Sequence, residues 1–362
     1  MTAPSTEQAT PARRDYPSYA QPLWRRLLLT RETAVIALLV AVVVYSLVNV
    51  ANFDGPLTLT YLLLDTTPIL LIALPMTLVI ITGEIDLSVA SIMGLSSVLL
   101  GVLVDAGWSV PTAALAALAV GLLCGALNGF LVAYVGLPSL AVTVGTLALF
   151  RGLAVGLLGT KAVTDFPDKW TDLATAKIGE TGIPQVVILF LVLAAAFAWL
   201  LHFTPFGRGV YDVGLNQEAA HFTGVDVERT KFMVFVLSGV ISALAGIFFT
   251  LRFGTARGDN ASGMEMQVIA AVLLGGVSIF GGRGKLPGVI AGVLLVGVLS
   301  SALRLDGVTV NVINIIIGLL LVASVVSTSV LAWVSGLTAR RNPSGNSPRN
   351  APSGAGAQGR SQ

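Results

Sequence analysis

Long apolar runs separated by short polar breaks fill most of the chain, and this pattern predicts membrane-spanning helices. A hydrocarbon core of about 30 Å needs roughly 20 apolar helical residues. Glycine and proline punctuate the breaks, as is typical of turns between helices. Ten segments fit: 33–50, 61–82, 87–104, 110–135, 138–159, 184–202, 232–251, 264–281, 288–303 and 308–330. The predicted fold is an all-α polytopic membrane helix bundle over residues 33–335.

The composition supports this fold class and excludes a soluble one. The 362 residues are 55% hydrophobic and 11% charged, whereas soluble domains carry about 25% charged residues. Residues 1–32 are polar, and too long and too charged before the first apolar run to be a typical cleavable signal. Residues 336–362 are rich in Ser, Gly, Pro and Asn. We expect the N-terminal segment to be largely disordered and residues 336–362 to form a disordered tail.

The distribution of Lys and Arg predicts the orientation of the bundle. If the N-terminus is cytoplasmic, fourteen of the 21 basic residues lie in cytoplasmic segments, six lie outside, and Arg151 lies in a span. Basic residues favour the cytoplasmic side. Ten spans then place both termini in the cytoplasm. The net charge of +2 comes from scattered residues, so we expect membrane lipid rather than nucleic acid around this chain.

The sequence lacks the residues that disulfide bonding, metal binding, catalysis and nucleotide binding would require. Cys124 is the single cysteine and His202 and His221 are the only histidines, so we expect no disulfide framework, no metal site and no cofactor. There is no H-E-x-x-H and no G-x-S-x-G, and we predict no catalytic residue. The fragment "GGRGKL" departs from a P-loop, so any ATP would be hydrolysed by a separate protein.

The predicted external connection, residues 160–183, mixes charges with Phe166, Trp170 and Leu173. This pattern suggests an amphipathic helix at the membrane interface. A solvated loop with one aromatic anchor fits the same residues.

Two carboxylates, Glu84 and Asp86, interrupt the apolar sequence, although a charge at mid-bilayer depth costs roughly 2.5–3.5 kcal/mol even on a lenient scale. Gly83 can end one helix and Asp86 can cap the next through its side-chain oxygen. The break near 83–86 is then either a tight hairpin at the cytoplasmic face or the centre of a re-entrant unit over 61–104. In the second case the carboxylates would face a wet cavity.

Three further polar residues in the spans join these carboxylates as candidates for a translocation pathway. They are Ser88, Asn128 and Arg151. Asn128 could line the pathway or bond a neighbouring helix. An intramembrane Arg needs a partner, and Glu84 or Asp86 is a candidate for Arg151.

The predicted cytoplasmic loop, residues 203–231, contains a short helix signal. Asn216 is a favourable N-cap, Gln217, Glu218, Ala219 and Ala220 suit a first turn, and Gly224 sits where a left-handed stop belongs. The helix is either a docking element for a soluble partner or a plain capped connector.

The segment "NQEAAHFTGV" resembles the E-A-A loop of ABC-importer permeases. The stretches "TGEIDLSVAS", "NGFLVAYVGLPSLAVTVGTLALFRGLA", "TPFGRGVYDVG" and "EMQVIAAVLLGGVSIFGGRGKLPGVIAGVLLVGVL" resemble permeases of the ribose/arabinose/galactose-type monosaccharide importers. The similarity covers about 60–330 and looks closest to rhamnose- and autoinducer-type members. Two positions depart from the family pattern: Glu84 stands where Gly is usual, and Ala90 where Gly is common.

The resemblance implies a multi-pass permease subunit of an ATP-driven sugar importer in a bacterial inner or plasma membrane, with a rhamnose-like sugar favoured. ATP-binding cassette subunits would grip Asn216–Gly224, an extracytoplasmic solute-binding protein would deliver the sugar, and a second permease copy or paralogue would complete the pathway. Glu84 or Asp86 would then accept sugar hydroxyls. The alternative is an ion-coupled secondary transporter with Glu84, Asp86 and Arg151 as its relay. A secondary transporter has no need for the loop helix.

Overall fold

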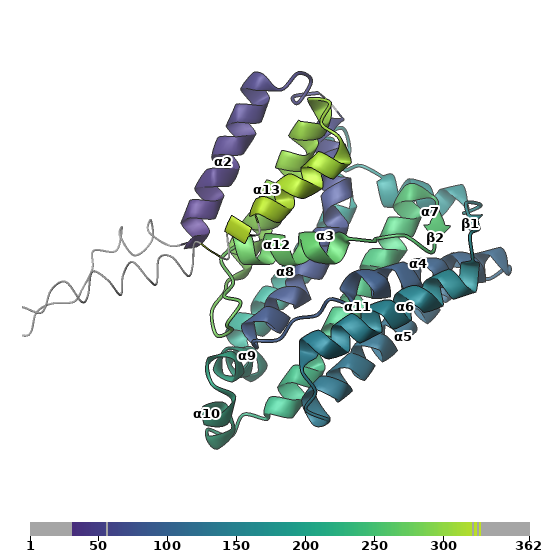
Figure 1. Ribbon diagram of the computed structural model, residues 1–362. Coiled ribbons are helices and arrows are strands. Elements are labelled where there is room, and N and C mark those ends of the chain that lie inside the picture. The colour runs from purple at the N-terminus through teal and green to yellow at the C-terminus, as the bar shows by residue number, and fades with distance from the viewer. Residues whose placement is uncertain (1–30, 56, 321, 324–325, 327–362) are drawn as a thin grey trace, which may run out of the picture.

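The computed structural model describes residues 31–320 except 56, together with residues 322, 323 and 326. The predictions for residues 1–30 and for the tail 336–362 lie outside the described residues. The described chain is almost entirely helical (Figure 1), which confirms the all-α bundle. Its helices before the loop 203–231 are α2 (Arg31–Asn49), α3 (Thr58–Ile81), α4 (Val89–Asp105), α5 (Val110–Gly129), the π-helix η1 (Phe130–Tyr134), α6 (Ser139–Leu158), α7 (Asp168–Thr175) and α8 (Val186–Phe203).

The remaining helices are α9 (Pro205–Leu215), α10 (Gln217–Phe222), α11 (Val227–Phe253), α12 (Met264–Leu274) and α13 (Leu286–Leu305), followed by the helix Val310–Leu320. Seven described helices are long and apolar enough to cross a membrane, and α4, α12 and Val310–Leu320 are shorter apolar helices. Each of the ten predicted segments thus coincides with an apolar helix, usually to within three residues at each end.

One predicted span is wrong in its length. The segment 264–281 forms a helix only as far as Leu274, and residues 275–285 are not helical. Gly276 has a φ of +94°, a left-handed conformation that glycine adopts without strain and that ends the helix. Gly275 also lies against the backbone of Val289 in α13, too close for a side chain. An 11-residue helix is only about 16 Å long, so α12 alone does not cross a bilayer.

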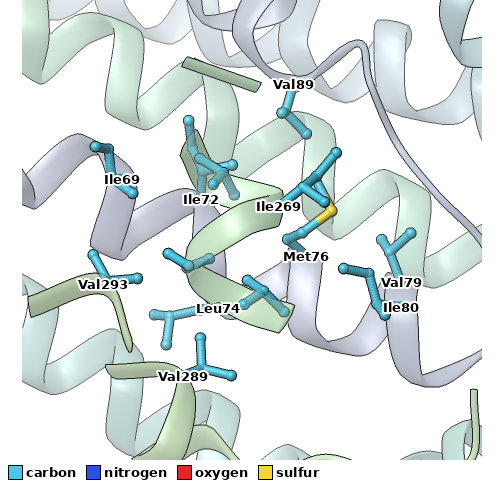
Figure 2. Close-up of a cluster of buried hydrophobic side chains, with 14 of the residues drawn as sticks. Ile69, Ile72, Leu74, Met76, Val79, Ile80, Val89, Ile269, Val289 and Val293 are labelled. Carbon is cyan, nitrogen blue, oxygen red and sulfur yellow. The ribbon is translucent and has the colours of Figure 1, made fainter. Parts of the chain in front are cut away.

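Helix α3 is the centre of the bundle. It is buried along nearly its whole length, in contrast to α2 and α8, whose surfaces are mostly open. Figure 2 shows Ile72, Leu74 and Met76 of α3 among side chains from α12 and α13. Helices α8 and α11 also pack against it. A helix that is apolar on all sides could face lipid, but α3 is covered by protein on all sides. It is therefore the central helix against which several later helices pack.

Helices α5 and α11 approach each other through small residues. Gly121, Gly125 and Gly129 recur every four residues on α5, and a Cβ at any of them would meet α11 within 3 Å. They face the α11 backbone around Gly239, and a Cβ at Gly239 would likewise meet the backbone of α5 within 3 Å. Small residues at this spacing let helix backbones pack closely in membranes. This contact holds Asn128 and Ser238 near the same point.

At the end of the bundle opposite α10, two connections are tied together. Strands β1 (Ala162–Val163) and β2 (Ala256–Arg257) pair antiparallel, with Ala162 opposite Arg257. The predicted amphipathic segment contains α7, so it is helical rather than an irregular loop, and Trp170 packs against a small apolar cluster that includes Val163 and Phe166. The proposed position of α7 at a membrane interface stays a prediction.

Candidate functional site

The break between α3 and α4 runs from the surface into the interior. Gly83 is exposed, Glu84 is partly buried, and Asp86 is 0% exposed. Asp86 contacts Ser238, which lies 11 residues into α11, about 17 Å from that helix's first residue. The break therefore begins at the α10 end of the bundle and reaches its middle, as in the internal alternative, but Asp86 is buried rather than open to the expected wet cavity.

The backbone of the break finds partners outside any helix. The Ile85 carbonyl oxygen accepts a hydrogen bond from the Thr143 hydroxyl (3.2 Å), and the Ile85 N–H donates one to the Ser139 hydroxyl (3.2 Å). Both partners lie in the first turns of α6. Non-helical backbone is tolerated at membrane depth only when its polar groups are satisfied in this way. The prediction that Asp86 caps the next helix is wrong: α4 begins at Val89 with Ser88 as its N-cap, and Asp86 accepts the N–H of Ser88 (3.0 Å) ahead of the helix.

A buried hydrogen-bonded cluster surrounds the Asp86 carboxylate. Its Oδ1 accepts from the Ser88 hydroxyl (2.6 Å) as well as from the Ser88 N–H, and its Oδ2 accepts from the Ser238 hydroxyl (2.8 Å). Asn128 donates its Nδ2 to the Ser88 hydroxyl (2.8 Å). All four residues are 0% exposed. Three donors to one carboxylate satisfy it without a cation, and together they fix the break to α5 and α11.

Glu84 forms an ion pair with Lys231. The Lys231 Nζ lies 2.6 Å from the Glu84 Oε1, and the two side chains are 10% and 12% exposed, respectively. Lys231 is in the second turn of α11, directly after the connection that holds α10. This pair joins the start of the break to the start of α11. This contact was not predicted, since Lys231 is one of the fourteen basic residues counted only for orientation.

Arg151 does not pair with Glu84 or Asp86, so that prediction is wrong. Its Nη1 donates to the carbonyl oxygens of Asn260 (2.6 Å) and Gly258 (3.2 Å), and its Nη2 donates to the Ala90 carbonyl (3.4 Å). The guanidinium therefore holds the connection between α11 and α12 against α4. Five fixed N–H donors suit a cluster of backbone carbonyls.

The helix predicted within residues 203–231 is α10. Asn216 caps it by accepting the N–H of Ala219 (2.9 Å), and Gly224 follows it with a φ of +87°, as predicted. Gln217, Glu218 and Ala219 are exposed, whereas Ala220 is buried against Val213 and Val227. Phe222 is 81% exposed. The helix thus rests on the bundle through one small residue and presents the rest of its surface outward.

Helix α9 connects α10 to the break. Gly214 lies against the carbonyl oxygen of Ile81 and the nitrogen of Gly282, too close for a side chain. Gly282 in turn donates its N–H to the Ile81 carbonyl (2.8 Å). The Tyr211 hydroxyl donates to the Gly284 carbonyl (2.8 Å), and burial raises the pKa of this tyrosine. Three backbone segments therefore meet where α3 ends and the break begins.

The structure brings together some of the predicted site residues and separates others. Asp86, Ser88 and Asn128 share one cluster, Glu84 lies nearer the α10 end, and Arg151 lies toward the opposite end. Ser238 completes the cluster and was missed, since one serine in an apolar run carries no distinctive signal. A role for these five residues in a translocation pathway stays a prediction. In the described part of the chain, no three His, Cys, Asp or Glu side chains are grouped to hold a metal ion.

Comparison with known proteins adds independent information. Residues 58–325 match the model of a family described as "Branched-chain amino acid transport system / permease component". No solved structure matches the chain.

Three curated relatives carry the same name, autoinducer 2 import system permease protein LsrD. The Salmonella typhimurium (strain LT2) protein is 36% identical over 317 residues, which cover 85% of this chain and 93% of the relative. The Klebsiella pneumoniae protein is 35% identical over 315 residues, covering 84% and 93%. The Escherichia coli O9:H4 protein is 37% identical over 309 residues, covering 83% and 92%.

Proposed function

We propose a function from the premise that this chain belongs to the family of ABC-importer permeases matched by its residues 58–325. It is a multi-pass bacterial inner-membrane protein and the permease of a sugar importer. We infer that separate ATP-binding cassette subunits drive it, that an extracytoplasmic solute-binding protein supplies it, and that a second permease copy or paralogue completes the pathway. The chain itself is a transport subunit, and ATP hydrolysis belongs to the partner.

The solute is inferred from the relatives. Their printed names assign them to autoinducer 2 import. We propose that this chain carries autoinducer 2 or a similar small polyhydroxylated solute, with monosaccharides as the class to test beside it. No contact among the described residues argues for rhamnose in particular.

The exposed, capped helix α10 is the observation that supports ATP-driven transport. A helix of six residues would fray alone, but the Asn216 cap and the Gly224 stop hold it in place. Its link to the interior is short: only Asn216 separates it from α9, which precedes it along the chain, and Gly214 of α9 lies against the end of α3. A force on α10 would therefore reach the Glu84–Lys231 pair and the break without crossing flexible chain.

Membership in the family does not favour the secondary-transporter alternative. The proposed relay would also need Glu84, Asp86 and Arg151 in contact. Arg151 instead bonds backbone carbonyls, and Glu84 pairs with Lys231.

The test is ATP-dependent uptake into membrane vesicles that contain this chain with its candidate ATP-binding and solute-binding partners. Labelled autoinducer 2, L-rhamnose and D-ribose are the probes. Glu218→Lys reverses an exposed charge on α10, and Gly224→Val forces a branched residue to a φ of +87°. Both variants should insert normally, lose co-purification with the ATP-binding subunit, and lose uptake.

Glu180→Lys is the matched control, because Glu180 is exposed in the connection between α7 and α8 at the opposite end of the bundle. It should transport as the unmodified chain does. Uptake by the chain alone, driven by an ion gradient and indifferent to Glu218→Lys, would refute the proposal.

A further inference from the structure

A mainly apolar cavity with several polar side chains in its wall opens at the end of the bundle opposite α10. Its volume is about 620 Å³, and its walls come from the start of α3, α12, the end of α13 and the helix Val310–Leu320. Small-molecule sites typically measure about 300–1,000 Å³. None of the four residues of the Asp86 cluster, which are Asp86, Ser88, Asn128 and Ser238, lines this cavity. It is therefore separate from the site already described.

The cavity reaches deep into the bundle. Its lining extends along α3 from Thr58 to Ile69, 11 residues or about 16 Å. That is roughly half of a 30 Å hydrocarbon core. Ile69, Val296 and Ile317 form its apolar floor, and all three are buried in the main core. A solute at this floor would have passed the open end of the bundle and half of its thickness.

Asp65 supplies a carboxylate in the wall of this cavity. Its side chain is 36% exposed, and its oxygens lie 3.5 Å from Arg252 Nη2 and 3.6 Å from Arg304 Nη1. Charge-assisted hydrogen bonds are about 2.7–2.9 Å long. Both ion pairs are therefore loose, and the carboxylate can accept a hydroxyl proton donor while the two arginines keep its charge compensated.

Further polar groups face the same space. Gln267 and Asn314 line the cavity from α12 and the last described helix, with a long 3.5 Å contact between their amides. Tyr61 lines it with an aromatic ring, and Arg252 lies over that ring, 5.5 Å from its centroid. A carboxylate, two amides and an aromatic face around an apolar floor can bind a ring that has hydroxyls at its edge and C–H groups on its faces.

We propose that this cavity is a binding site for the transported solute, a small polyhydroxylated molecule entering from the end opposite α10. The proposal rests on the proposed function and deepens it. Asp65 accepts from a solute hydroxyl, Gln267 and Asn314 bond further hydroxyls, and Tyr61 contacts a C–H face. The long contacts with Arg252 and Arg304 leave the Asp65 oxygens free to accept a further hydrogen bond.

The test uses protection of a single introduced thiol. Ser301 lines the cavity and is partly buried, and the native Cys124 is buried, so Ser301→Cys adds the one reactive thiol in the described chain. The chain is purified in lipid nanodiscs and labelled with a charged methanethiosulfonate reagent. Autoinducer 2, L-rhamnose and D-ribose are each added over a series of concentrations. The transported probe should slow labelling at least about tenfold, and Glu180→Cys, at the same end of the bundle but outside the cavity, should label equally fast with and without it.

Asp65→Asn, made in the Ser301→Cys background, tests the carboxylate itself. Loss of a hydrogen bond to a charged group should weaken protection about tenfold, which corresponds to ~1.4 kcal/mol. Gln267→Ala provides a second variant that breaks no ion pair and should weaken protection less. Asp105→Asn makes the same change at an exposed acid outside the cavity and should leave protection intact. Unchanged labelling without solute confirms that each variant is folded.

The outcomes separate this inference from the proposed function. Normal ATP-dependent uptake without any protection of Ser301→Cys would overturn the site and leave the importer standing. Protection on the purified chain without ATP-dependent uptake would support the site and refute the importer. Slow labelling at all solute concentrations, combined with a cross-link from Ser301→Cys to a second copy, would also overturn the inference, because the cavity would then be a subunit interface.

Discussion

The buried pair between Glu84 and Lys231 allows a sharp test of how the break is held. Two unit charges 2.6 Å apart attract by ~6 kcal/mol at an effective dielectric constant of 20. Desolvation of each charge offsets several kcal/mol of this attraction, so the pair as a whole adds little net stability. Breaking it is a different matter. Glu84→Gln leaves the Lys231 ammonium without its carboxylate, and Lys231→Met leaves the carboxylate without its cation, each at a cost of about 3–5 kcal/mol.

The double variant should therefore be more stable than either single variant. Glu84→Gln with Lys231→Met removes both charges, so no uncompensated charge remains, and we expect a coupling of ~2–3 kcal/mol between the two substitutions. The measurement is the thermal unfolding of detergent-purified protein for all four members of the cycle, followed by tryptophan fluorescence. On the proposed route from α10 to the interior, uptake requires the break and α11 to be joined, so it should be lost in both single variants and partly recover in the double.

The pair between Glu32 and Lys285 is the matched control. Its charges lie 3.3 Å apart, but the two side chains are 21% and 57% exposed. Exposed pairs contribute about 0–1 kcal/mol. The corresponding cycle should show little coupling. If the Glu84 and Lys231 substitutions also added without coupling, the pair would not hold the break, and the route from α10 to the interior would lose its first contact.

Three other substitutions test the remaining links. Gly214→Ala puts a Cβ against Ile81 and Gly282, and should cost about 1–3 kcal/mol in thermal unfolding and reduce ATP-dependent uptake, whereas Gly145→Ala in open space on α6 should do neither. Asn216→Ala removes the cap of α10, costing ~1 kcal/mol, and should weaken co-purification with the ATP-binding subunit; failure of Asn216→Asp to restore binding would contradict the capping role. Asp86→Ala leaves the hydroxyl donors of Ser88 and Ser238 unpaired and should cost about 1–3 kcal/mol or more in thermal unfolding. Asp86→Asn keeps one acceptor oxygen, so its melting temperature should lie between those of Asp86→Ala and the unmodified chain.

Local features of this chain were predictable from the sequence. The ten apolar segments follow from composition alone, and α10 follows from Asn216 and Gly224, each of which acts on backbone within a few residues of itself. The end of α12 was missed because Gly275 and Gly276 lie inside an unbroken apolar pattern. The left-handed conformation of Gly276 and the close contact of Gly275 with Val289 of α13 appear only in the structure.

The partners of the charged groups were not predictable in the same way. Arg151 was expected to seek a carboxylate, but it bonds the carbonyls of Gly258 and Asn260. Every residue carries a carbonyl, so such partners leave no mark in the sequence. Lys231 and Glu84 are distant along the chain, and only the packing of α11 beside α3 brings them together. Asp65 did leave a signal, since an acid inside the predicted span 61–82 is rare enough to require an explanation.

The three carboxylates on and after α3 differ in one property that decides what each can do. Asp86 has three donors in a sealed cluster, and a solute could replace them only by leaving buried donors unpaired. Glu84 is held at 2.6 Å by one cation, and releasing it would leave a buried charge uncompensated. Asp65 alone among them keeps two cations at 3.5 and 3.6 Å and remains 36% exposed. It can gain a hydroxyl without losing its charge compensation. A permease must bind its solute and then release it, and only the loosely held carboxylate permits both, which is why we place the solute at Asp65 and assign Glu84 and Asp86 to holding the break.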